Sequence, residues 1–194
     1  MHPVSGVTIR DARKEDAPFL AECILAGFHF SDFDEMVSDD MSDTLERLTE
    51  CEACEDTLYS FTKTRVAEVD GTPAGALLSY PGELFKELRD RTFRQYWPSF
   101  FELYPNDEPE ADPGEYYLDS LAVHPDFRKR GLGKVLLMDG IQKGVTLGFK
   151  KVTLIADTGY PHLIRFYESL GFVPEGHRHV TGTEFQRLIY TLLE

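Results

Sequence analysis

The sequence has few cysteines and no long apolar run, and each shortage excludes a class of protein. Three cysteines in 194 residues cannot build a disulfide framework, and they fit a reducing interior. The longest nearly apolar stretch, residues 23–28, is far shorter than the ~20 residues that a membrane span needs. The first six residues lack a basic start followed by an apolar segment, so no export signal is visible. We therefore expect a soluble, cytoplasmic protein that binds no membrane.

Basic residues are also scarce, with 20 Lys and Arg against 34 Asp and Glu, a net charge of −14. Residues 31–57 hold eleven acids and one base, and residues 105–114 hold four acids and no base, so net charges of −10 and −4 account for the total. A general nucleic-acid binder needs a basic face, so nucleic acid is not expected as a partner. One short run opposes the trend, because residues 128–134 contain four bases in seven. This local positive charge predicts a small anionic ligand.

The remaining composition is that of one globular domain, with 42% hydrophobic and 28% charged residues. We expect a single domain over residues 1–194 with an insert at about 82–114. Strand and helix patterns predict a mixed sheet with helices on its faces, and Asp70-Gly71 and Thr181-Gly182 predict hairpin turns. The expected strands cover 7–10, 60–69, 73–80, 115–123, 151–156, 172–180 and 184–193, and the expected helices cover 14–28, 40–54, 83–96, 131–146 and 162–170.

The segment from residue 115 to residue 146 reads as a strand, a glycine-containing basic loop and a helix. Gly131 and Gly133 let backbone N–H groups face an anion without obstruction, and the helix adds its positive N-terminal dipole. The loop matches neither G-x-x-x-x-G-K-[ST] nor G-x-G-x-x-G, the two common nucleotide motifs. Taken alone, it could also be a tight connection with solvated bases.

Three segments, in this order and spacing, resemble the GNAT acetyltransferase superfamily, and the resemblance extends over residues 7–193. Residues 116–125, YYLDSLAVHP, are similar to the central strand of that family. Residues 128–133, RKRGLG, match its [RQ]-x-x-G-x-[GA] pyrophosphate loop, and residues 165–172, RFYESLGF, resemble its late helix-to-strand signature. The resemblance implies an α+β fold with a mixed, mostly antiparallel sheet of about seven strands flanked by helices. It also implies an N-acetyltransferase that moves an acetyl group from acetyl-CoA to a primary amine of a small molecule by direct attack in a ternary complex.

The resemblance further implies where coenzyme A binds. The pyrophosphate would contact main-chain N–H groups of residues 130–134, with basic side chains at the rim. The pantetheine arm would pair with the central strand like an added strand, through a local splay of the sheet. The expected cofactor-binding residues are Leu121, Ala122, Val123, Arg128, Lys129, Arg130, Gly131, Leu132, Gly133 and Lys134.

Acyl transfer to an amine needs a proton acceptor, an oxyanion donor and a proton for the departing thiolate. The resemblance makes Tyr167 the candidate general acid. We favour Asp119 as the base, acting directly or through water, with Glu115 as an alternative, because a carboxylate in mid-strand must be paired, raised in pKa or facing a wet cleft. A strand N–H near Leu121 or Ala122 would serve the oxyanion. Arylalkylamine acetyltransferases of this superfamily carry histidines at positions matching 117 and 119, so their base mechanism does not transfer.

Strand alternation is expected to place Tyr117, Asp119 and Leu121 on one face of the central strand, and Tyr116, Leu118 and Ser120 on the other.

The acceptor site is expected near Phe28, Phe33 and Tyr117, in an acidic and aromatic vestibule that suits a cationic or aryl-alkyl amine. The acidic runs could instead be solvated faces, and the aromatic residues of the insert could be core. A protein or peptide N-acetyltransferase and a non-catalytic acyl-CoA sensor stay open as alternatives, as does a homodimer.

Cys51 and Cys54 form a C-x-x-C pair, but no second ligand pair of matching spacing follows. We therefore expect no metal.

Overall fold

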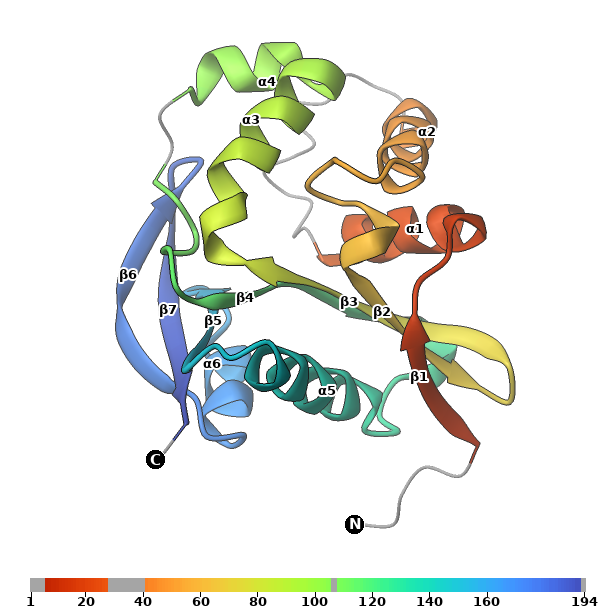
Figure 1. Ribbon diagram of the computed structural model, residues 1–194, viewed down its shortest axis with the longest axis vertical. Helices are drawn as coiled ribbons and strands as arrows, with labels where there is room; N and C mark the ends of the chain where they lie inside the picture. Colours follow the sequence, from red (N-terminus) through yellow and green to blue (C-terminus); the bar gives the residue numbers. More distant parts are fainter. Residues whose placement is uncertain (1–5, 28–40, 106–107, 193–194) are drawn as a thin grey trace.

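The computed structural model describes residues 6–27, 41–105 and 108–192, which form one seven-stranded sheet with helices on both faces (Figure 1). The strand order is β1-β2-β3-β4-β5-β7-β6, and every neighbouring pair is antiparallel except β4 and β5, which are parallel. The predicted α+β class and the mixed, mostly antiparallel sheet are confirmed. The strands are β1 Val7–Asp11, β2 Thr64–Val69, β3 Thr72–Pro81, β4 Tyr116–Val123, β5 Lys151–Asp157, β6 Val173–Val180 and β7 Thr183–Thr191.

The helices divide between the two faces of the sheet. Helices α5 and α6 lie on one side, and α1, α2, α3 and α4 lie on the other (Figure 1). All of the helices in the described ranges are too short or too polar to cross a bilayer. The α-helices are α1 Ala17–Gly27, α2 Met41–Glu52, α3 Phe85–Tyr96, α4 Pro98–Leu103, α5 Leu132–Thr146 and α6 Pro161–Glu168, with short 3₁₀ turns at Lys14–Asp16, Phe61–Lys63, Gly82–Leu84 and Pro125–Phe127.

Helix α5 packs closely on the middle of the sheet because two of its positions have no side chain. A Cβ atom on Gly140 would lie 2.5 Å from Cδ2 of Leu77, and one on Gly144 would lie 2.8 Å from Cδ1 of Tyr116. Either distance is shorter than van der Waals contact allows, so larger residues would push α5 away from β3 and β4. This close approach fixes the position of the N-terminus of α5 relative to β4.

Both predicted hairpins are present, and their turn residues adopt the left-handed backbone that a tight two-residue turn requires. Asp70 and Gly71 have φ of 50° and 80°, and Thr181 and Gly182 have φ of 50° and 83°. Because the β6–β7 hairpin closes the sheet on the far side of β5, β6 is an edge strand.

The segment between β3 and β4 is more helical than the sequence pattern predicts. The expected helix is present as α3, but α4 follows it directly, with Pro98 in its first turn, where proline is favoured. The aromatic residues of the segment pack on one another, with Phe93 stacked on Phe100 at 4.9 Å between ring centroids, and on the core below. They therefore form a small core, as in the alternative interpretation of these aromatic residues, and not the wall of an open vestibule.

The prediction that side chains alternate strictly between the two faces of β4 is wrong, because a bulge interrupts the strand at Asp119. Leu78 of β3 pairs with Ser120, and the next residue, Ser79, pairs with Leu118, so Asp119 is the extra residue. The bulge reverses the two faces beyond it. Leu121 packs with Leu118 on the α5 side, whereas Ser120 lies on the α1 side.

Strands β4 and β5 separate after a short contact. Only Tyr116–Val152 and Tyr117–Thr153 are paired, while β5 continues along β7 over its whole length. From residue 118 to residue 123, the β5 side of β4 has no strand partner among the described residues. The sheet therefore has the splay that the family resemblance implies, and a free strand edge lines it.

Candidate functional site

The loop after β4 has the backbone shape of an anion-binding nest. Lys129 and Gly131 both have left-handed φ, 61° and 83°, and Gly131 is the residue that caps the N-terminus of α5. Alternating left- and right-handed residues turn successive N–H groups toward one concave surface. Gly131 has no side chain to accept a hydrogen bond from the first turn of α5, so the first N–H groups of this helix stay available to a ligand.

The basic side chains of this loop are partly used to hold its shape. The Arg128 Nε donates to the carbonyl oxygen of Val123 at 3.0 Å, which ties the loop to the end of β4. The Arg130 guanidinium donates to the carbonyl oxygen of Asp126 at 3.1 Å and lies 5.4 Å from the ring centroid of Phe127. Lys129 and Lys134 are exposed. The loop thus presents backbone donors in a fixed shape with positive charge around them.

The free edge of β4 presents N–H groups to the gap beside this loop. His124 N–H donates to the carbonyl oxygen of Ala74 at 2.9 Å, so it points toward β3. Donor directions alternate along a strand, so the N–H groups of Val123 and Leu121 point away from β3 and into the gap, whereas that of Ala122 points toward β3. Of the two predicted oxyanion donors, Leu121 has the available direction. A Cβ on Gly133 would lie 3.8 Å from Cδ2 of Leu121, so the first turn of α5 packs against a side chain of this part of β4.

Asp119 is held by two hydroxyl groups at the bulge. Tyr80 donates a short hydrogen bond to one carboxylate oxygen, and Ser120 Oγ donates to the other at 2.7 Å. Burial raises the pKa of Asp119 above its usual value of 3.8, while the two hydrogen bonds lower it, and the net shift is upward. A carboxyl group with a raised pKa next to the free strand edge has the chemistry of a general base.

Glu115, the alternative base, is instead part of a buried ion-pair network. Its carboxylate pairs closely with Arg187 of β7, and it also accepts hydrogen bonds from Thr153 Oγ1 and from the Asp112 N–H, both at 3.2 Å. Arg187, which sequence reasoning missed, also pairs with Glu175 of β6. Glu115 therefore links the insert to β5 and β7, and these contacts favour Asp119 over Glu115 as the base.

Tyr167 lies at the end of α6 and packs against Phe172 with the two rings edge to face, 6.1 Å between centroids. Burial raises its pKa above 10.0, so the hydroxyl keeps its proton at neutral pH. Tyr167 is near enough to Tyr117 to contribute to the raised pKa of that residue.

The predicted acceptor residues are only partly placed by the structure. Tyr117 is fully buried, donates a hydrogen bond to Glu110 Oε2 at 2.7 Å and packs edge to face on Tyr80. The structure therefore shows Tyr117 in the core beside Asp119, and a contact with an acceptor stays a prediction. Phe28 and Phe33 lie outside the described residues.

Glu52, at the end of α2, is a buried acid that sequence reasoning missed. Its side chain faces a narrow cleft between α1 and the β3–β4 pair, and the cleft is also lined by Ser120 and Ala122. The sequence does contain one signal for the burial of Glu52. Glu52 follows the buried Leu48 by four positions and so lies on the same face of the helix.

The C-x-x-C pair makes no disulfide. Cys51 is buried, and Cys54 contacts the Tyr96 hydroxyl at 3.5 Å. Within the described ranges, no three His, Cys, Asp or Glu side chains are grouped as ligands of a metal ion.

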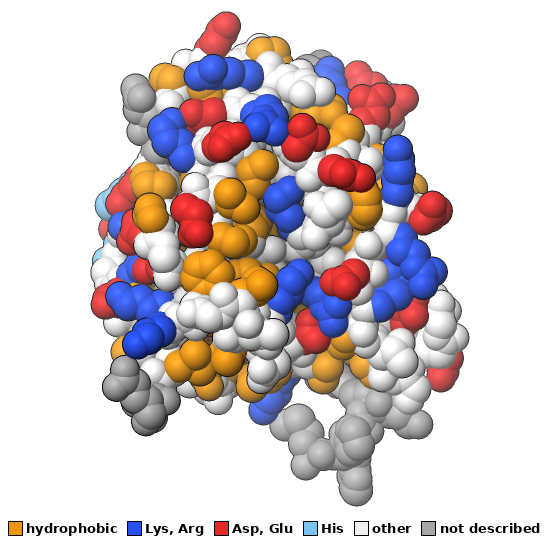
Figure 2. All heavy atoms as spheres, viewed as in Figure 1, with side chains coloured by type: hydrophobic (Ala, Val, Ile, Leu, Met, Phe, Trp, Pro, Cys, Tyr) orange, Lys and Arg blue, Asp and Glu red, His pale blue; other side chains and the backbone are white. Residues whose placement is uncertain are grey.

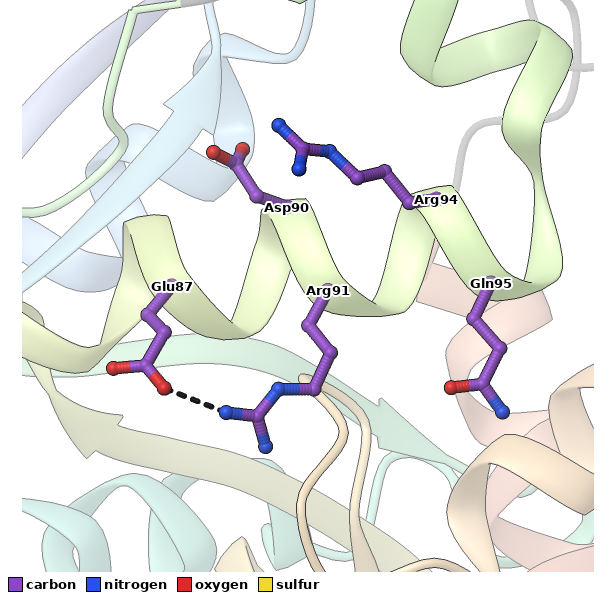
Figure 3. Close-up of a pocket in the computed structure, with 5 residues that line it drawn as sticks. All are labelled: Glu87, Asp90, Arg91, Arg94 and Gln95. Atoms are coloured by element: carbon purple, nitrogen blue, oxygen red, sulfur yellow. Dashed lines mark hydrogen bonds and ion pairs between the residues drawn. The ribbon is translucent and has the colours of Figure 1, made fainter.

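A broad, shallow hollow lies on the outer face of α3, away from β4 (Figure 3). Its lining residues carry both signs of charge, and Glu87 pairs with Arg91 at 2.6 Å along the helix. Such an i, i+4 pair is typical of a solvated helix face. We assign no function to this hollow.

Comparison with known proteins gives one family match. A model of the acetyltransferase (GNAT) family matches residues 28–172. The uncharacterized N-acetyltransferase ycf52 of Gracilaria tenuistipitata var. liui is 38% identical over 58 residues, which are 29% of this chain and 30% of the relative. The chain therefore matches less than a third of the length of this curated relative.

Two solved structures share the fold over nearly the whole chain. One, described as an acetyltransferase, has 25% identity and a TM-score of 0.76, covering 96% of this chain and 100% of its own. The other, an N-acetyltransferase from Staphylococcus aureus Mu50, has 22% identity and a TM-score of 0.77, covering 94% and 99%.

Proposed function

This chain belongs to the acetyltransferase (GNAT) family, and we propose that it transfers an acetyl group from acetyl-CoA to a primary amine of a small molecule. The observation that carries the proposal is that the nest at residues 128–134 follows the free edge of β4 and is tied to its end through Arg128. A long ligand with a phosphate group and an amide-containing arm can use both parts at once, the phosphate at the helix N-terminus and the arm as an added strand.

The residues present fit coenzyme A. Backbone N–H groups of residues 130–134 would bind its diphosphate, with Lys129 and Lys134 adding positive charge at the rim. The N–H group of Val123 would pair with the pantetheine arm, and that of Leu121 would face the thioester end of the arm. Acetyl-CoA supplies an acetyl group activated as a thioester.

The chemistry assigned to the protein is proton transfer and charge stabilisation. Asp119 takes a proton from the acceptor ammonium, which leaves a neutral amine whose lone pair forms the new C–N bond. The Leu121 N–H donates to the carbonyl oxygen as negative charge develops on it. Tyr167 gives its hydroxyl proton to the sulfur as the C–S bond breaks. The second proton of the attacking nitrogen then returns to the tyrosinate, which leaves a neutral amide, and Asp119 releases its proton to solvent.

We propose a cationic or aryl-alkyl amine as the acceptor because acidic side chains surround the approach to β4. Glu52, Asp119 and Glu110 lie within the protein on the α1–α3 side of the sheet, and exposed acids cover α2, where Figure 2 shows red side chains gathered. Negative charge at a site attracts a cation and raises its local concentration.

A panel of amines with isotopically labelled acetyl-CoA tests this proposal. We expect kcat/KM for a polyamine or an aryl-alkylamine to exceed that for glutamate and aspartate by about tenfold or more, because one favourable charge interaction contributes about 1.4 kcal/mol. Mass spectrometry of the products measures the transfer. Faster acetylation of the acidic amino acids would contradict the cationic acceptor, and faster acetylation of a peptide N-terminus would contradict the small-molecule acceptor.

A further inference from the structure

The buried carboxyl group of Glu52 is not explained by the packing of α2. Glu52 is 1% exposed, and its Oε2 has no hydrogen-bond partner among the described residues. The positive charge of Lys63 acts on Glu52 from a distance, but the Lys63 ammonium donates to the carbonyl oxygens of Thr57 and Glu55 at 2.8 and 3.2 Å. An ionised carboxylate buried without a partner is costly, so Glu52 needs either a proton or a cation.

The cleft beside Glu52 has mostly apolar walls and room for one small polar group. The cleft that it faces has Leu20, Cys23 and Ile24 of α1 along one wall. The opposite wall comes from β2, β3 and β4: Thr64, Ala76, Leu78, Ser120 and Ala122. Its free space is about that of one water molecule, which is also the size of an amino group.

The cleft is placed directly beside the reacting part of the proposed active site. Ser120 connects the two, because its side chain lines the cleft and its hydroxyl donates to Asp119. Ala122 follows Leu121, whose N–H points into the gap on the other edge of the same strand. An amine in the cleft would therefore lie beside Ser120, whose hydroxyl group contacts the proposed base.

We propose that Glu52 binds the amino group of the acceptor as an ammonium ion in this cleft, which places it beside Asp119. This inference rests on the proposed acetyltransferase function and adds a second carboxylate to its acceptor site. The negative charges of Glu52 and Asp119 repel each other, and burial raises the pKa of both groups. A bound cation relieves this repulsion, so the site selects acceptors that arrive protonated.

The test uses Glu52→Gln, which keeps the shape of the side chain and removes its charge. Glu50→Gln is the matched control, because Glu50 is exposed on the same helix. Butylamine, a cation at pH 7.5, and phenylhydrazine, which is neutral there, serve as probe acceptors. We expect Glu52→Gln to raise KM for butylamine about 10- to 100-fold, the range for a lost hydrogen bond between charged groups, and to change KM for phenylhydrazine less than about twofold. Glu50→Gln is expected to change neither value.

Equal losses with both probes would mean that Glu52 has only a structural role, and no loss with either would remove it from the site. Either result overturns the inference. Calorimetric titration of butylammonium chloride into the coenzyme A-saturated protein gives a second readout that needs no turnover. Weaker binding of butylammonium to Glu52→Gln, with unchanged binding to Glu50→Gln, supports the inference even if neither probe is acetylated. A lack of turnover with both probes would count against the proposed function and not against the inference. Equal binding by the three proteins overturns the inference.

Discussion

Replacement of Tyr167 by phenylalanine is expected to lower kcat about 100-fold, the order of magnitude of general acid catalysis by a positioned side chain. The substitution removes only the hydroxyl group, and the ring keeps its packing against Phe172. Because burial raises the pKa of Tyr167, its hydroxyl holds a proton at neutral pH and can give it to the departing sulfur. We expect the dissociation constant of coenzyme A to stay unchanged, since the hydroxyl acts on the reaction and not on the diphosphate. Steady-state kinetics and calorimetry measure the two quantities.

Tyr190→Phe is the matched control for this substitution. Tyr190 packs against the same Phe172 ring, 5.6 Å between centroids, and loses the same hydroxyl group. We expect its kcat to stay within about twofold of wild type, since no step in the proposed reaction uses this residue. Wild-type kcat in Tyr167→Phe would remove Tyr167 from the mechanism.

Replacement of Gly131 by aspartate is expected to weaken coenzyme A binding about 10- to 100-fold, because it adds a negative charge a few ångströms from the proposed diphosphate site. The new carboxylate would also accept hydrogen bonds from the first turn of α5, which are the donors that the diphosphate needs. No heavy atom lies within 4 Å of a Cβ built at this position, so the side chain itself meets no obstruction. Aspartate is among the residues that tolerate a φ of 83°.

Gly131→Asn separates charge from conformation. Asparagine has nearly the same shape, tolerates the same backbone and carries no charge. We expect it to weaken binding much less than aspartate does. We expect the two variants to unfold at similar temperatures, both at or below that of the wild type, because the φ of 83° strains either side chain. Equal affinities of Gly131→Asp and wild type, measured by calorimetry, would show that the diphosphate is not held at this helix N-terminus.

Much of the fold follows from short-range signals that need no tertiary information. The Asp70-Gly71 and Thr181-Gly182 turns are set by backbone preferences of two residues each, and the structure confirms both. The basic loop could be placed between a strand and a helix for the same reason, because Gly131 permits the left-handed backbone at the cap of α5. Helix α4 was missed although Pro98 is well placed to begin it, because its 6 residues are too few to show a helical pattern.

The candidate site depends on features that a one-dimensional pattern does not contain. The bulge at Asp119 arises from the pairing of β4 with β3, and it moves Ser120 to the α1 side and Leu121 to the α5 side. Glu52 belongs to an acidic run that reads as a solvated surface. Its spacing from Leu48 places it on the buried face of α2, but the cleft that it faces forms only when α1 and β4 pack around it. The sequence thus predicts residues whose role depends on local backbone conformation. It does not predict residues whose role depends on contacts between segments that are distant in the chain.

Amide hydrogen exchange, with and without acetyl-CoA, tests most directly whether the loop at residues 128–134 and the edge of β4 hold the cofactor. We predict that acetyl-CoA slows exchange at the amides of residues 130–134 and at those of Leu121 and Val123, because these N–H groups become hydrogen-bonded to the ligand. The amide of Ala122, which points toward β3, is expected to change little. Unchanged exchange at residues 130–134 with saturating acetyl-CoA, or slowing confined to another part of the chain, would contradict the account.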